Sequence, residues 1–132
     1  RAAGLQFGWH NHDFEFLPLE DGTYPIEAIL EAAPSLVLEL DLAWVAVAGG
    51  SPVEWIERYK NRIISAHIKD HAPKGENLDE GGWADVGYGV LDWDKISACL
   101  RATGIGRYVL EHDNPKDGVR FATRSYEKLI TF

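Results

Sequence analysis

Four short apolar runs, each ending in polar and ionisable residues, are the feature of this sequence that most constrains its fold. Their length and composition predict β-strands. Segments with the apolar spacing of helices separate the runs, which predicts parallel strands joined by crossover helices. The predicted strands are Leu5–His12, Leu36–Asp41, Ile63–Asp70 and Arg107–Asp113.

The predicted helices begin and end at recognisable residues. Pro25 and Pro52 each stand where a helix would begin, a position that favours proline, and Ser51 is a suitable N-cap. Gly104 is expected to end the third helix. The glycine-rich stretch His71–Leu91 is predicted to be a long loop, and a loop of that length is usually functional or mobile. The four helices are expected at Pro25–Ala33, Pro52–Asn61, Asp92–Thr103 and Asp117–Ile130.

Side chains alternate between an apolar and a polar face along each predicted strand. In Leu36–Asp41 the three leucines share one face, and Glu39 and Asp41 share the other. In the next strand, Ile64 is expected on the apolar face and His67 on the polar one. A face that turns polar toward the strand end is typical of a barrel interior below an active site. An open doubly wound sheet would instead bury both faces. The sequence therefore predicts an α/β fold, a (β/α)8 TIM barrel to which this chain contributes four βα units.

Composition narrows the possible partners and location. The chain has 132 residues and a formal net charge of −8, which disfavours binding to nucleic acid. Its apolar runs are too short to span a membrane. The single cysteine, Cys99, has no partner for an internal disulfide, and we expect a cytoplasmic protein. The chain has no methionine and opens Arg-Ala-Ala-Gly, so we expect a processed or incomplete chain.

Histidines and carboxylates gather at the ends of the predicted strands, which meet at one rim in a parallel barrel. Such a group suits Mn²⁺, Mg²⁺, Co²⁺ or Zn²⁺, because a cation offsets the repulsion between neighbouring carboxylates. Taken alone, Asp41 would also fit a helix N-cap, and Lys69 and Asp70 would fit an exposed ion pair. Their occurrence at matched positions favours a metal site. The residues concerned are 10–15, Asp41, 67–70 and 111–113.

Five ordered motifs resemble the sugar phosphate isomerase/epimerase family, the xylose-isomerase-like TIM barrels. This family also includes hydroxypyruvate isomerases, inosose isomerases and ketose 3-epimerases. The resemblance covers essentially the whole chain, and it implies that residues 1–132 are the C-terminal half of the barrel, about its last four βα units. One departure is Tyr88, where the family commonly has Glu or Gln. The motifs are His10–Phe16, Asp41–Trp44 with Ala48–Pro52, Ser65–Asp70, Gly87–Trp93 and Val109–Asp113.

The resemblance also implies one divalent metal ion and its ligands. Glu15 lies beyond the regular strand, whereas strand parity directs His10 and His12 inward, so His10 is a rival for the first ligand position. The expected ligands are Glu15, Asp41, His67 and Glu111.

By the same resemblance, the activity would be isomerisation or epimerisation of a sugar, sugar phosphate or related keto-polyol through an ene-diolate. Two glutamates would exchange the proton, while a histidine and a lysine would orient or polarise substrate oxygens. The expected catalytic side chains are Glu15, Glu111, His12 and Lys69. The expected substrate-binding side chains are His10, Trp44 and Asp70.

Two alternatives stay open. A metal-dependent dehydratase or lyase of the same fold would use the same ligands, and a non-catalytic sugar-binding module would need no matched glutamates. Beyond a small carbohydrate substrate, the expected partner is the missing N-terminal half of the barrel or a second copy of the chain. Four strands leave two open sheet edges, so the chain alone is expected to be inactive.

Overall fold

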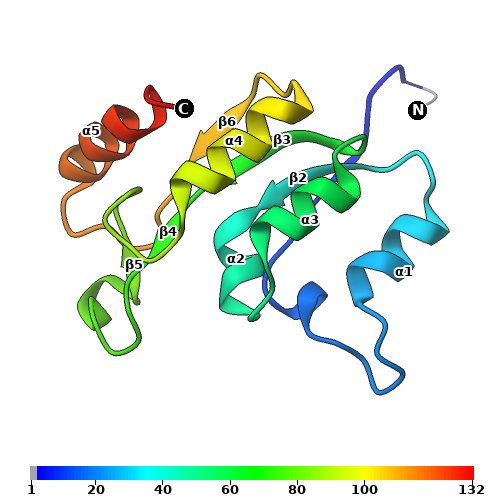
Figure 1. The fold of residues 1–132 in the computed structure, drawn as a ribbon, viewed down its shortest axis with the longest axis horizontal. Helices are drawn as coiled ribbons and strands as arrows, with labels where there is room; N and C mark the ends of the chain where they lie inside the picture. Colours follow the sequence, from blue (N-terminus) through cyan, green and yellow to red (C-terminus); the bar gives the residue numbers. More distant parts are fainter. Residues whose placement is uncertain (1–2) are drawn as a thin grey trace.

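Four parallel strands form the central sheet of this protein (Figure 1). The computed structural model describes residues 3–132. Neighbouring strands pair in the order β1-β2-β3-β6, and every pair is parallel, as predicted. The strands are β1 Gly8–His10, β2 Val37–Asp41, β3 Ile63–Ile68 and β6 Tyr108–Leu110.

The predicted helices are all present, and one more occurs between β2 and the second predicted helix. The additional helix follows β2 without a loop, because Asp41 Oδ1 accepts hydrogen bonds from Ala43 N at 2.9 Å and Trp44 N at 3.1 Å. Ser51 is an N-cap, and Gly104 ends its helix with φ 74°, both as predicted. The helices are α1 Pro25–Ala32, α2 Leu42–Val47, α3 Pro52–Tyr59, α4 Trp93–Thr103 and α5 Gly118–Leu129.

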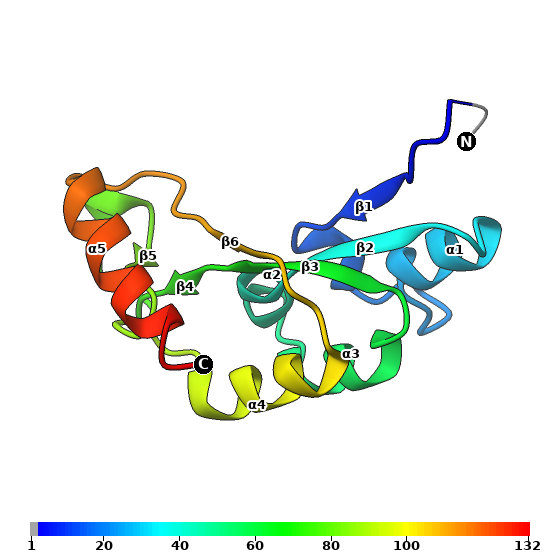
Figure 2. The same cartoon turned by 90° about the horizontal axis from the view of Figure 1, so that it is seen from above.

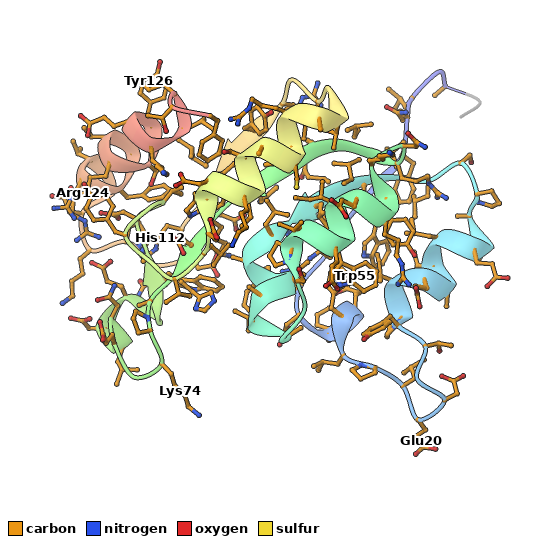
Figure 3. All side chains as sticks on the ribbon, viewed as in Figure 1. Glu20, Trp55, Lys74, His112, Arg124 and Tyr126 are labelled. Atoms are coloured by element: carbon orange, nitrogen blue, oxygen red, sulfur yellow. The ribbon has the colours of Figure 1, made fainter. Side chains whose placement is uncertain are left out.

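Helices α1, α3 and α4 lie on one side of the sheet, and within residues 3–132 no helix covers the opposite side (Figure 2). Leu38 and Leu40 on β2 are buried in the resulting core, together with Leu100 of α4. Trp55 of α3 packs its ring against Phe16 and Tyr24, which ties the segment before α1 to this layer (Figure 3). The strand order and the one-sided helix layer are those of half a barrel.

A bulge in β3 changes the side-chain alternation expected there. Leu38 pairs with Ile63, but Glu39 pairs with Ser65, so Ile64 is the extra residue. Ile63 is therefore buried at 5% exposure, and Ile64 is 37% exposed. The prediction that Ile64 faces the helices was wrong, because it assumed an unbroken period of two.

The glycine-rich segment contains its own small hairpin. Strand β4, Asp70–His71, pairs antiparallel with β5, Trp83–Ala84. Short 3-10 helices occur at Leu78–Glu80 and, after β1, at Phe14–Phe16. Figure 1 places α5 beside this hairpin at one end of the sheet. Within residues 3–132, no helix combines the length and the apolar character of a membrane span.

Candidate metal centre

Four ionisable side chains converge at the C-terminal ends of the four parallel strands. His10 ends β1, Asp41 ends β2, His67 lies near the end of β3, and Glu111 follows β6. One donor atom from each lies within 4.8 Å of the donor atoms of the other three. Strand register produces the convergence, since Asp41 pairs directly with His67. The predicted gathering of donors at one rim is thus present, with His10 in the position expected for Glu15.

Two atoms of this group are buried without hydrogen-bond partners. Asp41 Oδ1 accepts the two backbone bonds at the start of α2, but Asp41 Oδ2 has none, and neither has His10 Nδ1. Burial raises the pKa of Asp41 to about 6, although the backbone N–H of Trp44 and the charge of Lys69 oppose the shift. Buried polar atoms are normally paired, so unpaired atoms in a cluster of oxygen and nitrogen donors fit a cation.

His67 joins two carboxylates across the sheet. Its Nδ1 contacts Glu111 Oε2, and its Nε2 lies 3.0 Å from Glu39 Oε1. The Ser65 hydroxyl donates to Glu39 Oε2 at 2.7 Å and lowers the pKa of Glu39. Burial alone would raise the pKa of Glu111, but the His67 hydrogen bond and the Lys69 charge outweigh it and lower the pKa. Glu39 was not among the expected site residues, although it shares a strand face with Asp41.

Lys69 is a buried ammonium group between the four-residue group and two indole rings. Its side chain is 1% exposed, and Nζ lies 2.7 Å from Asp113 Oδ1 and 3.4 Å from Glu111 Oε1. The same atom lies 4.8 Å from the ring centroid of Trp44 and 4.1 Å from that of Trp83. Lys69 is therefore held beside Glu111 by charge and by cation–π contacts. Sequence reasoning missed Trp83, because no strand pattern marks its short hairpin strand.

Glu15 occupies a different place from the one expected of a metal ligand. The 3-10 turn after β1 folds its carboxylate back, where Oε1 accepts from Trp9 Nε1 and Oε2 from His12 N, both at 2.9 Å. Its side chain is buried at 2% exposure, and it is not a member of the four-residue group. The His12 ring instead lies 5.3 Å from the His10 ring. The structure therefore brings His10 into the group and uses Glu15 to support the strand end.

Asp70 anchors the loop before α4. Asp70 was expected to bind substrate, but its side chain is fully buried. A Cβ on Gly89 would lie 2.2 Å from Asp70 Oδ1 and 2.3 Å from His71 O, and Gly87 has φ +85°. Glycine is thus required at Gly87 by the positive φ and at Gly89 by the close approach of Asp70 and His71. Tyr88, between them, is 60% exposed. The donors to the Asp70 carboxylate are His71 N, Gly87 N, Gly89 N, Leu91 N and Trp93 Nε1.

His12 and Trp44 lie side by side next to the four-residue group. Their ring centroids are 5.6 Å apart; His12 is exposed and Trp44 is partly buried. They form the aromatic border of the group on the side of β1 and α2.

Comparison with known proteins identifies relatives by structure rather than by sequence. No protein-family model matches the chain, and no curated protein matches it significantly in sequence. Two sugar phosphate isomerase/epimerase structures from Parabacteroides distasonis match with a TM-score of 0.74 at 27% and 29% identity. The matches cover 99% and 97% of this chain, but 48% and 46% of those chains.

A xylose isomerase domain protein from Planctomyces limnophilus has the same fold, with a TM-score of 0.72 at 21% identity, over 98% of this chain and 47% of that one. The chain thus spans about half the length of the solved structures that it matches. The resemblance and the fold class predicted from the motifs are confirmed: the structural neighbours of this chain are sugar phosphate isomerase/epimerase and xylose-isomerase-like TIM-barrel proteins, and the chain has the fold of half such a barrel.

Proposed function

We propose that this chain belongs to a divalent-metal-dependent isomerase or epimerase of a sugar, sugar phosphate or related keto-polyol. The observation that carries the proposal is the convergence of one donor atom from each of four strand ends within 4.8 Å, with two of the buried atoms in these side chains unpartnered. Structural neighbours described as sugar phosphate isomerase/epimerase support the class of reaction. We further propose that residues 1–132 are the C-terminal half of the barrel.

The proposed metal ligands are His10, Asp41, His67 and Glu111. Their mixed imidazole and carboxylate donors suit Mn²⁺, Mg²⁺, Co²⁺ or Zn²⁺. A divalent ion bound there supplies Lewis-acid polarisation of a substrate carbonyl. This set replaces Glu15 by His10, because Glu15 is engaged by Trp9 and by the backbone of His12.

Lys69 is the proposed residue that stabilises negative charge at the reacting centre, with its ammonium group beside Glu111. Its ammonium group is fixed by Asp113 and two indole rings, and a fixed donor stabilises developing negative charge on a substrate oxygen without further reorganisation. Glu111, which lies 3.4 Å from Lys69 Nζ, is the proposed base; in an isomerisation it would take a proton from the carbon next to the carbonyl and deliver it to the former carbonyl carbon. A positioned base of this kind contributes roughly 10²–10⁴-fold to the rate.

The aromatic border would contact the sugar. Trp44 and His12 lie on the same side of the group, and an indole face offers an apolar surface to the C–H groups of a sugar ring. His12 would donate to or accept from a substrate hydroxyl. Glu15 would help here indirectly, because its bond to His12 N holds the chain at the end of β1.

The proposed partner is the other half of the barrel. Strands β1 and β6 are the edges of the four-stranded sheet, and edge strands carry unpaired backbone groups that recruit further strands. Four additional βα units, either from a preceding segment or from a second copy of this chain, would pair with both edges. They would also supply the remaining loops around the substrate.

Hydrogen exchange with solvent tests the proposed reaction. The complete enzyme, loaded with Mn²⁺, is incubated with candidate aldoses and ketoses in D2O, and the products are analysed by NMR. We expect deuterium at the carbon next to the carbonyl, and none with the His67→Ala variant as the matched control. Turnover that keeps the original hydrogen would contradict proton transfer, and an absence of turnover across the panel would contradict the reaction class.

A further inference from the structure

The imidazole of His67 has a carboxylate against each of its ring nitrogens. Nδ1 contacts Glu111, a member of the four-residue group, whereas Nε2 faces Glu39 Oε1 at 3.0 Å on the other side of the ring. Glu39 does not belong to the four-residue group. The two ring nitrogens therefore have different surroundings, one in the donor cluster and one outside it.

Glu39 is itself held in place. The register of β2 and β3 puts Glu39 opposite Ser65 and Asp41 opposite His67. The Ser65 hydroxyl, on a fully buried residue, donates to Glu39 Oε2 at 2.7 Å. The Ser65 hydroxyl on β3 thus fixes Oε2 of Glu39, and Oε1 faces His67. The β3 bulge at Ile64 is what brings Ser65 into this register.

We propose that Glu39 is a positioning residue for His67. Glu39 holds the ring by accepting a hydrogen bond from Nε2–H, so that the lone pair of Nδ1 faces the proposed metal site. A neutral imidazole carries its proton on one nitrogen only, and the hydrogen bond made by that nitrogen selects the tautomer. Carboxylates that bind the far nitrogen of a ligand histidine also fix the orientation of the ring. The inference rests on the proposed metal site and adds a residue that acts through one of its ligands.

The binding of Mn²⁺ to variants of the complete protein tests this role. Loss of an outer partner of this kind typically weakens metal affinity by about 10–100-fold, so we expect E39A to show a loss in that range in competition with a chelating dye. E39Q keeps an oxygen that can accept from Nε2–H, and we expect it to recover most of the affinity. E31A, which removes an exposed glutamate from α1, is the control and should bind like wild type.

The tautomer of His67 gives a second readout that does not require metal. In ¹⁵N NMR of the metal-free protein, where Glu111 faces Nδ1 and Glu39 faces Nε2, we expect a proton on Nε2 in wild type and E39Q, and a shift of the ring proton from Nε2 toward Nδ1 in E39A. Should E39A fail to fold, E39D serves in its place, because it withdraws the carboxylate by one methylene and is expected to lose affinity as well.

The outcomes separate this inference from the proposed function. Wild-type affinity in E39A or E39D, together with an unchanged tautomer, would overturn the role of Glu39 and leave the metal site standing. A wild-type protein that binds no Mn²⁺ would overturn both. An equal loss of affinity in E39A and E39Q would show that the charge, and not the hydrogen bond, matters, which also contradicts the proposed role.

Discussion

The side chain of Asn11 makes two hydrogen bonds with the backbone of Asp41, across the ends of β1 and β2. Asn11 Oδ1 accepts from Asp41 N at 2.9 Å, and Asn11 Nδ2 donates to Asp41 O at 3.1 Å. Both residues are fully buried. The amide of Asn11 thus continues the strand pairing where the β1 backbone turns away, and it keeps Asp41 beside His10.

Replacement of Asn11 by leucine is expected to weaken both the fold and the proposed metal site. The change leaves the backbone N–H of Asp41 without the partner it has in Asn11 Oδ1, and an unsatisfied buried group costs about 1–3 kcal/mol. We expect the free energy of unfolding of the complete protein, measured with urea, to fall by at least about 1 kcal/mol. The exposed Asn61, changed to leucine, is the control. An equal effect at both positions would show that the pairing does not matter.

The choice between His10 and Glu15 as a metal ligand can be decided by Mn²⁺ affinity. His10 belongs to the group of four donors, whereas both oxygens of Glu15 are bonded to Trp9 and His12. We expect His10→Gln to lose more than the roughly 10–100-fold typical of outer partners, and Glu15→Gln to lose less. The reverse order would make Glu15 the ligand, as the resemblance of the motif implied.

Gly89→Ala is expected to destabilise the loop that Asp70 anchors. An added Cβ would lie 2.2 Å from Asp70 Oδ1 and 2.3 Å from His71 O, so backbone has to move and hydrogen bonds to Asp70 are lost. Overpacking of this kind typically costs about 1–3 kcal/mol, and it should appear as a lower Tm in a thermal melt of the complete protein. Gly106→Ala, where a Cβ meets nothing within 4 Å, is the control. A loss as large at Gly106 would remove the steric explanation.

Completion of the barrel is expected to be necessary for activity. The sheet edges β1 and β6 are unpaired within the described residues, and Ile64, at the β3 bulge, is 37% exposed. We expect the 132-residue chain by itself to associate or to unfold without cooperativity, and to lack turnover, because it has the fold of only half a barrel and would supply only its own share of the substrate-facing loops. Analytical ultracentrifugation and an activity assay check this. A cooperatively folding, active monomer would contradict the half-barrel interpretation.

The sequence correctly predicts several features of the sheet and of the strand ends. Alternation along β2 correctly predicts that Leu38 and Leu40 are buried, and the strand ends correctly predict that Asp41, His67 and Glu111 meet. These predictions hold because a period of two and the alignment of parallel strands are local or topological consequences of the pattern.

The position of Glu15 was not predictable in the same way. Its carboxylate is directed by the 3-10 turn Phe14–Phe16 and captured by Trp9 Nε1, and neither contact leaves a periodic mark in the sequence. The burial of Asp70 was unpredictable for the same reason, because the five donors to its carboxylate include residues up to 23 positions away. Such contacts depend on how a loop closes, which composition does not specify.

The amino-acid sequence by itself determined the alternation of strands and helices, the rim at which the ionisable residues gather, and the family that the chain resembles. Only the tertiary structure decided which side chains lie together: His10 rather than Glu15 within the four-residue group, Glu39 next to His67, and Trp83 against Lys69. The physical reason is that hydrophobic periodicity specifies which face of an element is buried. A hydrogen bond or a ring contact of a few ångströms instead depends on strand register, on the bulge at Ile64 and on loop closure, which the whole fold sets together.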